Sequence, residues 1–329
     1  MRSNVLITGA TGFIGLHLAA LHLASGDTVT LADVRDGGES DREFCDAVGQ
    51  PNARFVRADL TTAGGWAALG GGYDFVYHLA AVNGTELFYS QPHEVLRTNL
   101  LATIHGLDWF AANCRAGKVL FTSSNEAYAG ALDAFGVLPL PTPEDVPLVV
   151  ADVTNPRWSY GGSKLVGEQL FLHYATAYGL RAVIVRPHNF YGPRAGSRHV
   201  IPQLIDRIVR RVDPFPLYGP DETRSFCYIG DAVTALRSTM LSDRTDGAIL
   251  HIGSTVETRI GDLADALFDI AGWRPDRIVA EPSPPGSVRR RLPDVSRLRE
   301  ATGWAGTTPL ADGLRQTYAW YAGQLRGSS

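Results

Sequence analysis

The sequence predicts an α/β protein with a Rossmann-type doubly wound parallel sheet and a smaller C-terminal substrate-binding lobe. Three observations support this fold class. Short apolar runs alternate with helix-length segments through the first half of the chain. A glycine-rich turn follows the first run. The runs also lack polar alternation, as expected for strands that are buried on both faces of a sheet.

The first half of the chain is expected to supply most of the sheet. Strands are expected at Val5–Thr8, Thr28–Leu31, Arg54–Arg57, Phe75–His78, Lys118–Thr122 and Arg181–Val185. Helices are expected at 15–25, 92–113 and 160–178. Strands that alternate with helices in this way favour parallel pairing, because each helix returns the chain to the same end of the sheet.

The rhythm changes after about Arg186, where Pro and Gly become frequent and predict loops and short elements. A helix at Asp231–Leu241 and a strand at Ala248–Ile252 are expected to rejoin the sheet. The tail from Thr258 is expected to form two helices around a Pro-rich loop, 282–293. The predicted domains are therefore a Rossmann domain of residues 1–186, joined by about 229–252, and a substrate lobe of residues 187–228 and 253–329.

Composition excludes several classes of function. The 329 residues carry a net charge of −4 with no long basic block, which argues against a nucleic acid or a membrane surface as partner. The three cysteines are widely spaced without a CxxC pair, which favours a reducing cytoplasm. The histidines form no HExxH pair, so we expect no metal site. No apolar run is long enough to span a membrane.

A dinucleotide site is predicted at the first strand-to-helix turn. Gly9, Gly12 and Gly15 follow the strand in a GxxGxxG spacing, which lets the backbone and the helix N-terminus approach a pyrophosphate. Asp33 closes the second strand, where a carboxylate binds the ribose 2′-OH of NAD and repels a 2′-phosphate. The nearby Arg35 leaves NADP open. Further expected cofactor contacts are Phe13, Ile14, Asp59, Leu60, Ala80, Asn99, Thr122, Tyr160, Lys164 and Pro187.

A catalytic pair is predicted on the helix over residues 160–178. Tyr160 and Lys164 are four residues apart and therefore share one helix face. A nearby ammonium lowers the pKa of a tyrosine and makes it a usable general base. Ser124 follows the fifth strand, at the carboxyl edge where doubly wound sheets bind ligands, and is expected to hydrogen-bond a substrate hydroxyl beside Tyr160.

These motifs occur in an order that resembles the NAD-dependent epimerase/dehydratase family, the extended short-chain dehydrogenases that modify nucleotide-sugars. The resemblance covers nearly the whole chain. It rests on the glycine turn, the His78-Leu79-Ala80-Ala81 strand end, Asn99, the Thr122-Ser123-Ser124 run, the Tyr160/Lys164 pair and the segment 186–193, RPHNFYGP. It implies that Tyr160 takes the proton of a sugar hydroxyl, usually at C4, while hydride passes to tightly held NAD.

The same resemblance implies residues for the substrate. Asn189 would contact the diphosphate of a nucleotide-sugar, and Arg224, in the segment 223–226, would lie near it. Arg291 corresponds to another arginine on the substrate side, and Asn125 follows the catalytic serine. An arginine suits this work because its fork binds phosphate oxygens in pairs. Glu126 completes the predicted catalytic set with Tyr160, Lys164 and Ser124.

Three reactions share the 4-keto sugar: epimerisation, dehydration and decarboxylation of a uronate. We place epimerisation first because it demands least of the site. Asn125 stands where hexose 4,6-dehydratases carry an acid, although GDP-mannose-type dehydratases manage without one. The segment 155–160, NPRWSY, together with Glu126 and Arg291, resembles a UDP-glucuronate decarboxylase. Two different classes of protein also stay open: a non-catalytic NAD-binding protein, and a net dehydrogenase that uses free NAD(P)H.

Two further expectations concern loops and assembly. The Pro-rich segment from Gly130 to Trp158 lies between two catalytic residues, so we expect it to form a loop over the substrate. The resemblance also implies a homodimer, formed through the helices at 92–113 and 160–178. The sequence itself shows only that these helices carry apolar residues on more than one side.

Overall fold

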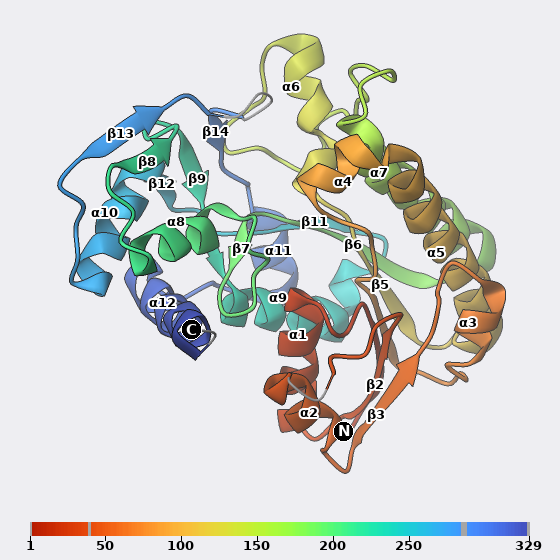
Figure 1. Ribbon diagram of the computed structural model, residues 1–329. Coiled ribbons are helices and arrows are strands. Elements are labelled where there is room, and N and C mark those ends of the chain that lie inside the picture. The colour runs from red at the N-terminus through yellow and green to blue at the C-terminus, as the bar shows by residue number, and fades with distance from the viewer. Residues whose placement is uncertain (1, 39–40, 284–287, 328–329) are drawn as a thin grey trace.

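The computed structural model describes residues 2–38, 41–283 and 288–327. Its centre is a parallel sheet of seven strands in the order β11-β6-β5-β4-β1-β2-β3 (Figure 1). The strands are β1 (Asn4–Thr8), β2 (Thr28–Asp33), β3 (Ala53–Arg57), β4 (Phe75–His78), β5 (Lys118–Thr122), β6 (Arg181–Pro187) and β11 (Ile249–Ile252). The doubly wound α/β fold predicted from the sequence is confirmed.

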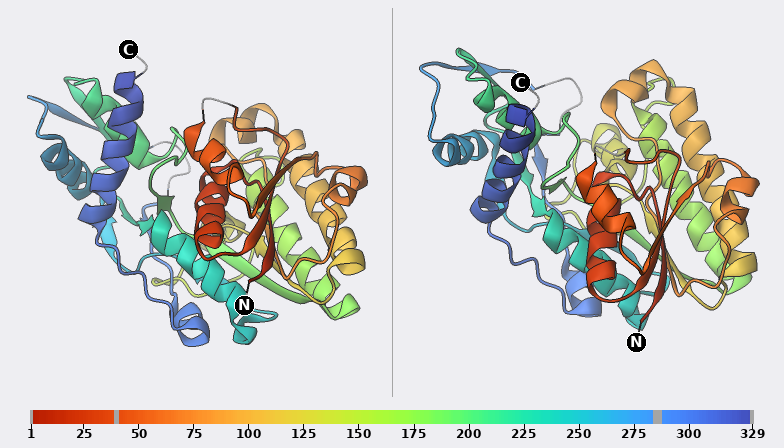
Figure 2. Two further views of the ribbon diagram at one scale, coloured as in Figure 1. Left: turned by 90° about the horizontal axis from the view of Figure 1, so that it is seen from below. Right: turned by 60° about the horizontal axis from the view of Figure 1, so that its bottom comes forward.

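Helices cover both faces of the sheet (Figure 2). One face is covered by α1 (Phe13–Ala24), α2 (Arg42–Val48), α9 (Ile229–Leu241) and α11 (Ser296–Thr302). The other is covered by α3 (Ala63–Ala67), α5 (Pro92–Asn113) and α7 (Trp158–Tyr178). Short elements add to the connections of the sheet: α4 (Thr85–Ser90), η1 (Asn125–Ala127), α6 (Ala129–Phe135) and η2 (Asp243–Thr245).

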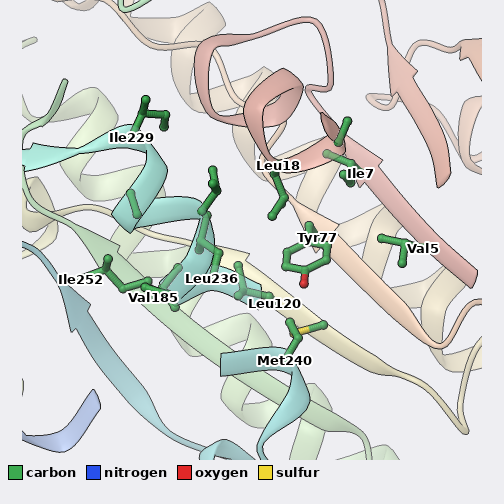
Figure 3. Close-up of a cluster of buried hydrophobic side chains, with 14 of the residues drawn as sticks. Val5, Ile7, Leu18, Tyr77, Leu120, Val185, Ile229, Leu236, Met240 and Ile252 are labelled. Carbon is green, nitrogen blue, oxygen red and sulfur yellow. The ribbon is translucent and has the colours of Figure 1, made fainter. Parts of the chain in front are cut away.

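The core lies between the sheet and these helices. Figure 3 shows the layer under α1 and α9, where Leu18 and Leu236 meet the strand residues Ile7, Leu120 and Val185. These side chains are almost fully buried. Burial of such side chains contributes about 1.5–3 kcal/mol each. The continuous apolar strands are thus explained by burial on both faces of the sheet.

The C-terminal half builds the smaller lobe beside the carboxyl edge of the sheet. Its elements are β7 (Phe190–Tyr191), α8 (Val200–Val209), β8 (Phe215–Tyr218), β9 (Thr223–Ser225), β10 (Cys227–Tyr228), β12 (Glu257–Arg259), α10 (Ile260–Ala271), β13 (Ile278–Glu281), β14 (Arg290–Arg291) and α12 (Leu310–Gly327). A separate apolar cluster lies between α8, α10 and α12. The exact division of the chain at residues 186, 228 and 252 stays a prediction.

The loops and short elements expected after Arg186 are present, and they include the helix α8, which was not predicted individually. One expectation about this half was wrong. The tail after Thr258 holds three helices and short strands rather than two helices around a loop. Residues 284–287 of the expected Pro-rich loop lie outside the described residues. Among the described helices, none is both long and apolar enough to cross a membrane.

Buried polar contacts join distant parts of the chain at the amino edge of the sheet. Lys118 is fully buried, and its Nζ donates to Thr245 Oγ1 at 2.6 Å and lies 2.7 Å from Asp246 Oδ1. His22 lies between Asp27 and Tyr77, with Nδ1 2.7 Å from Asp27 Oδ2 and Nε2 2.9 Å from Tyr77 Oη. These contacts hold α1 and η2 against the ends of the strands.

We expect Asp27→Asn to lower the free energy of unfolding by about 2–3 kcal/mol, because it removes the charged acceptor of a buried imidazole and of the Ser3 amide. Urea denaturation monitored by circular dichroism would measure this. Asp133→Asn, at an exposed carboxylate on α6, is the control. The cofactor content should stay unchanged, since Asp27 lies at the edge opposite the glycine turn. If Asp27→Asn and the control had equal free energies of unfolding, the hydrogen bonds of Asp27 would not stabilise the fold.

Candidate active site

The glycine turn places backbone where a pyrophosphate would bind. Gly9 has φ +67° and packs on the backbone of Ala80, so that a Cβ there would lie only 2.9 Å from Ala80 Cα. A Cβ on Gly15 would lie 2.3 Å from Gly9 O. Gly12 precedes α1 with no side-chain cap on the helix. The first-turn N–H groups of α1 are therefore available to an anion, and these residues fit a dinucleotide.

Asp33 lies at the carboxyl end of β2, next to this turn. Its Oδ2 accepts hydrogen bonds from Thr11 N at 3.1 Å and from Thr11 Oγ1 at 2.8 Å. Asp59 lies at the end of β3, where its side chain is exposed and accepts from Thr61. Two carboxylates at adjacent strand ends suit the hydroxyls and the base of an adenosine better than a 2′-phosphate.

The other predicted cofactor residues fall into two groups. Thr122 and Pro187 lie at the carboxyl ends of β5 and β6, whereas Phe13, Ile14 and Leu60 pack on the core. Asn99 is buried on α5 and its amide contacts Val82 N, Val82 O and Ser163 Oγ. Asn99 therefore joins the segment after β4 to α7, and these hydrogen bonds hold the wall of the site.

Tyr160 and Lys164 project from the first turns of α7 toward the end of β5. The helix comes close to η1 because residue 161 is glycine: a Cβ there would lie 2.7 Å from Glu126 O. Lys164 Nζ donates to Thr122 O at 2.7 Å and lies 5.7 Å from the centre of the Tyr160 ring. The sequence-predicted pair is thus brought together beside Ser124, which hydrogen-bonds Tyr160.

Burial sets the charge of this pair. Desolvation raises the pKa of the Tyr160 phenol, and the Ser124 hydrogen bond opposes this rise. Desolvation also lowers the pKa of the Lys164 ammonium to about 7, against an opposing attraction from Glu168. Lys164 is therefore poised to gain or lose a proton near neutral pH. The raised pKa keeps the Tyr160 phenol protonated, so the lowering expected from the nearby ammonium is not found, because desolvation dominates.

The low pKa of Lys164 predicts a pH-dependent stability. Below pH 7 the amine is protonated in both states, and the folded protein bears the full cost of burying the charge. As the pH rises from 7 toward the unfolded value of 10.5, the folded amine is neutral while the unfolded one stays charged, so this cost disappears. We expect Lys164→Met to stabilise the protein most at pH 7, with the gain shrinking by up to about 1.4 kcal/mol per pH unit.

Urea denaturation of both proteins at several pH values between 7 and 9.5 would measure this difference in unfolding free energy. Comparing the two proteins at each pH removes the contributions of other titrating groups. A difference that stays constant with pH would show that Lys164 keeps an ordinary pKa in the folded protein.

A cluster of charged side chains around Glu126 lies close to Tyr160. Glu126 Oε1 lies 2.6 Å from Arg291 Nη2, and Glu126 Oε2 lies 3.9 Å from Arg157 Nη2. β14 pairs with β9 in parallel so that Arg291 lies opposite Arg224, whose Nη2 lies 2.8 Å from Glu222 Oε2. Burial would raise the pKa of Glu126, but Arg291, Arg157 and Arg224 outweigh it and lower that pKa.

The cluster therefore carries one excess positive charge, because three arginines meet two glutamates. Next to it, Asn125 Nδ2 and His188 Nδ1 are buried and have no hydrogen-bond partner among the described residues. Asn125, His188 and Arg291 line the same small cavity. Tyr128 Oη lies 2.8 Å from His188 Nε2, and burial lowers the pKa of His188 so that its ring is neutral. An acidic, oxygen-rich group would suit this surface.

The remaining predicted residues take other positions. Asn189 adopts φ +42°, and its Nδ2 donates to Ser225 O at 2.9 Å, which supports the backbone before β10. The segment from Gly130 to Trp158 begins with the helix α6 and then continues largely without regular structure. Its role over a substrate stays a prediction, as does the homodimer.

Sequence reasoning missed several residues at the site. Phe88 on α4 stacks on the Tyr160 ring, with ring centres 5.1 Å apart, and no local pattern identifies it. Glu168 accepts from both Arg186 Nε and Arg186 Nη2, at 2.8 and 2.7 Å, and from Ser123 Oγ. This buried network fixes α7 against β5 and β6. Its signal in the sequence is a carboxylate four residues after Lys164 on the same helix face.

Comparison with known proteins gives consistent matches. A model of the NAD dependent epimerase/dehydratase family matches residues 5–253. The chain is 32% identical to the UDP-N-acetyl-alpha-D-glucosaminuronate decarboxylase of Bacillus cytotoxicus over 331 residues, which covers 98% of each protein. The UDP-glucose 4-epimerase of Thermotoga maritima, solved with UDP-glucose, superposes with a TM-score of 0.83 at 25% identity, covering 98% of this chain and 99% of that one.

A third relative carries the cofactor. The dTDP-glucose 4,6-dehydratase of Streptomyces venezuelae, solved with NAD bound, superposes with a TM-score of 0.85 at 25% identity and covers 100% of this chain and 98% of that one. The three relatives catalyse three different reactions on nucleotide-sugars. The choice among these reactions therefore has to come from the side chains of the site.

Proposed function

The chain belongs to the NAD-dependent epimerase/dehydratase family and is an NAD-dependent enzyme that modifies nucleotide-sugars, and we propose that its reaction is the decarboxylation of a nucleoside-diphosphate uronate. The observation that carries this proposal is the charged cluster around Glu126. Its excess positive charge suits the C6 carboxylate of a uronate, and a neutral hexose offers no such group.

Two further observations support a uronate. Asn125 Nδ2, a donor that has no partner in the part of the chain the structure describes, fits a carboxylate oxygen. The same residue is an amide, which cannot donate the proton that the acid of the dTDP-glucose-type 4,6-dehydratases supplies at this position. The decarboxylase from Bacillus cytotoxicus matches the chain from end to end and acts on a uronate by its name. Epimerisation of a neutral hexose, which offers no carboxylate, would make no use of the positive charge of Arg291.

The reaction follows from the chemistry of a β-keto acid. Tyr160 takes the proton of the C4 hydroxyl while Ser124 holds the oxygen by a hydrogen bond. NAD, which the glycine turn and Asp33 would hold, would supply the redox chemistry as the acceptor and later the donor of a hydride at C4. With a ketone at C4, the C5–C6 bond breaks, its electron pair moves to the C4 oxygen, and Tyr160 and Ser124 stabilise that oxyanion. C5 then takes a proton.

Glu126 and Arg291 divide the work on the carboxylate. Arg291 attracts the C6 carboxylate and orients it, since its guanidinium can bind a second anion beside Glu126. Glu126 is ionised and lies on the same guanidinium. It therefore repels the substrate carboxylate, and this repulsion vanishes when neutral carbon dioxide forms. An interaction that is unfavourable only before the bond breaks raises kcat.

The test is a substrate panel that contains UDP-glucuronate and UDP-N-acetylglucosaminuronate beside UDP-glucose, dTDP-glucose and GDP-, CDP- and ADP-sugars. We expect loss of carbon dioxide from one uronate, detected by product mass, and no net NADH. An unchanged mass with a new sugar stereoisomer in the NMR spectrum would show epimerisation instead. Loss of water from a hexose would show dehydration, and either result would overturn the proposal.

A further inference from the structure

The segment between β7 and α8, residues 192–199, crosses from the smaller lobe to the Rossmann sheet, and we call it the strap. Three of the loops that follow strands of the sheet contact it. Arg194 contacts the loop after β1 through Thr11 O at 3.4 Å, and the loop after β2 through Asp41. Arg198 forms an ion pair with Glu86 of α4, after β4.

The Arg194–Asp41 contact is the strongest of these. Both terminal guanidinium nitrogens donate to the carboxylate, Nη1 to Oδ1 and Nη2 to Oδ2, each at 2.7 Å. Nη1 also reaches Glu43 Oε2 at 3.2 Å, and Glu43 in turn accepts from Trp320 of α12 at 2.7 Å. Only 17% of each of the Arg194 and Asp41 side chains is exposed, so solvent screens the pair less than a surface ion pair.

The backbone of the strap is held in an unusual shape. Arg194 has φ +68°, a left-handed conformation that costs a residue with a Cβ about 1–2 kcal/mol. Such conformations persist where surrounding contacts compensate for them, and they concentrate at functional sites. The neighbouring Pro193 contributes its carbonyl oxygen, which lies 3.0 Å from His17 Nε2 on the second turn of α1.

These contacts lie on the predicted cofactor site. Thr11 belongs to the glycine turn and is hydrogen-bonded by Asp33, while His17 follows the N-terminus of α1. In a doubly wound sheet the dinucleotide lies across the carboxyl ends of the strands, at the point between β1 and β4 where the strand order reverses. The strap spans this same edge from the loop after β2 to the loop after β4.

We propose that the strap retains NAD through the catalytic cycle and that Arg194 is the positioning residue that keeps it closed. The inference rests on the proposed function in one respect: a decarboxylase with no net redox change must keep its reduced cofactor until C4 is reduced again. A contact between two lobes across the cofactor crevice slows dissociation without touching the reacting atoms. It acts on the lifetime of the bound cofactor.

The first test uses the cofactor alone. Arg194→Gln and Asp41→Asn each break the paired contact from one side. We expect both variants to purify with less NAD and to release NADH at least about tenfold faster, as measured by stopped-flow fluorescence, which corresponds to about 1.4 kcal/mol. The double variant should release NADH no faster than the single variants, because the two side chains act through one contact.

The matched control is Arg210→Gln, which breaks the exposed Arg210–Asp206 ion pair on α8. It should leave the NAD content and the release rate unchanged. Thermal unfolding of each variant with saturating NAD separates a folding defect from faster release. Wild-type release rates in folded Arg194→Gln and Asp41→Asn would overturn the proposal.

The second test adds the uronate. In Arg194→Gln we expect some turnovers to stop halfway, so that NADH and the 4-keto product appear in solution in equal amounts. Faster NADH release by both variants without decarboxylation by the wild type would refute the proposed function but support the proposal that the strap retains NAD. Decarboxylation together with unchanged NADH release would refute the strap and leave the function intact.

Discussion

Replacement of Tyr160 by phenylalanine is expected to lower kcat by about 100- to 10,000-fold, because it removes the phenol that lies beside Ser124 and Lys164 at the end of β5. The ring should still stack on Phe88, so the fold and the cofactor content should remain. Steady-state rates with the active uronate would measure the effect. An assay for NADH in a single turnover would show whether the first oxidation itself is lost.

The matched control for this prediction lies on the same helix. Tyr174 of α7 is partly exposed and donates a hydrogen bond to Asp108 of α5 at 2.8 Å, away from the site. Tyr174→Phe makes the same chemical change and should leave kcat unaltered. If Tyr160→Phe kept more than about a tenth of the wild-type rate, another group would have to serve as the base.

Glu126→Gln is expected to separate the two halves of the reaction. The change keeps the shape of the side chain and removes the negative charge that opposes the substrate carboxylate. We expect KM for the uronate to fall and kcat for loss of carbon dioxide to fall about 100-fold or more, the combination produced when an unfavourable ground-state interaction is removed. Oxidation at C4 should continue, so enzyme-bound NADH should accumulate and be visible by absorbance.

A carboxylate away from the site provides the comparison. Glu94→Gln, at a half-exposed side chain in the first turn of α5, should change neither constant. Glu126 itself also contributes to structure, since Arg291 and Arg157 lose their anion in the variant. A fall in kcat with a matching rise in KM and no NADH signal would mean that Glu126 serves only to hold these arginines, and the proposed division of work would be wrong.

The sequence predicted the large sheet well because its strands are buried on both faces. Such strands consist of uninterrupted apolar and β-branched residues, and β5 begins and ends at the expected residues. The helix α8 escaped notice because Pro202 was taken as a loop signal. Pro202 lies in the first turn of that helix, where a missing N–H costs nothing.

Some features of the site follow from local sequence spacing, whereas others depend on contacts between residues that are far apart in the chain. The Tyr160/Lys164 pair follows from a helical spacing and could be predicted. The pairing of Glu126 with Arg291 depends on the register of β14 against β9, which brings together residues far apart in the chain. Arg194 and Asp41 are also 153 residues apart in the chain. No local sequence pattern predicts these long-range ion pairs, because they form only when the two lobes pack together.

The position of β11 in the sheet affects how the chain can fold while it is being synthesised on the ribosome. β6 is complete once residue 187 has been made, yet its outer edge stays open until residues 249–252 arrive to pair with it. Lys118, deep in the sheet, must likewise wait for acceptors that belong to residues 239–246. A nascent chain between these lengths exposes an unpaired strand edge, the feature through which chains associate wrongly. We therefore expect incomplete chains of 187 to about 248 residues to associate wrongly more readily than the finished protein.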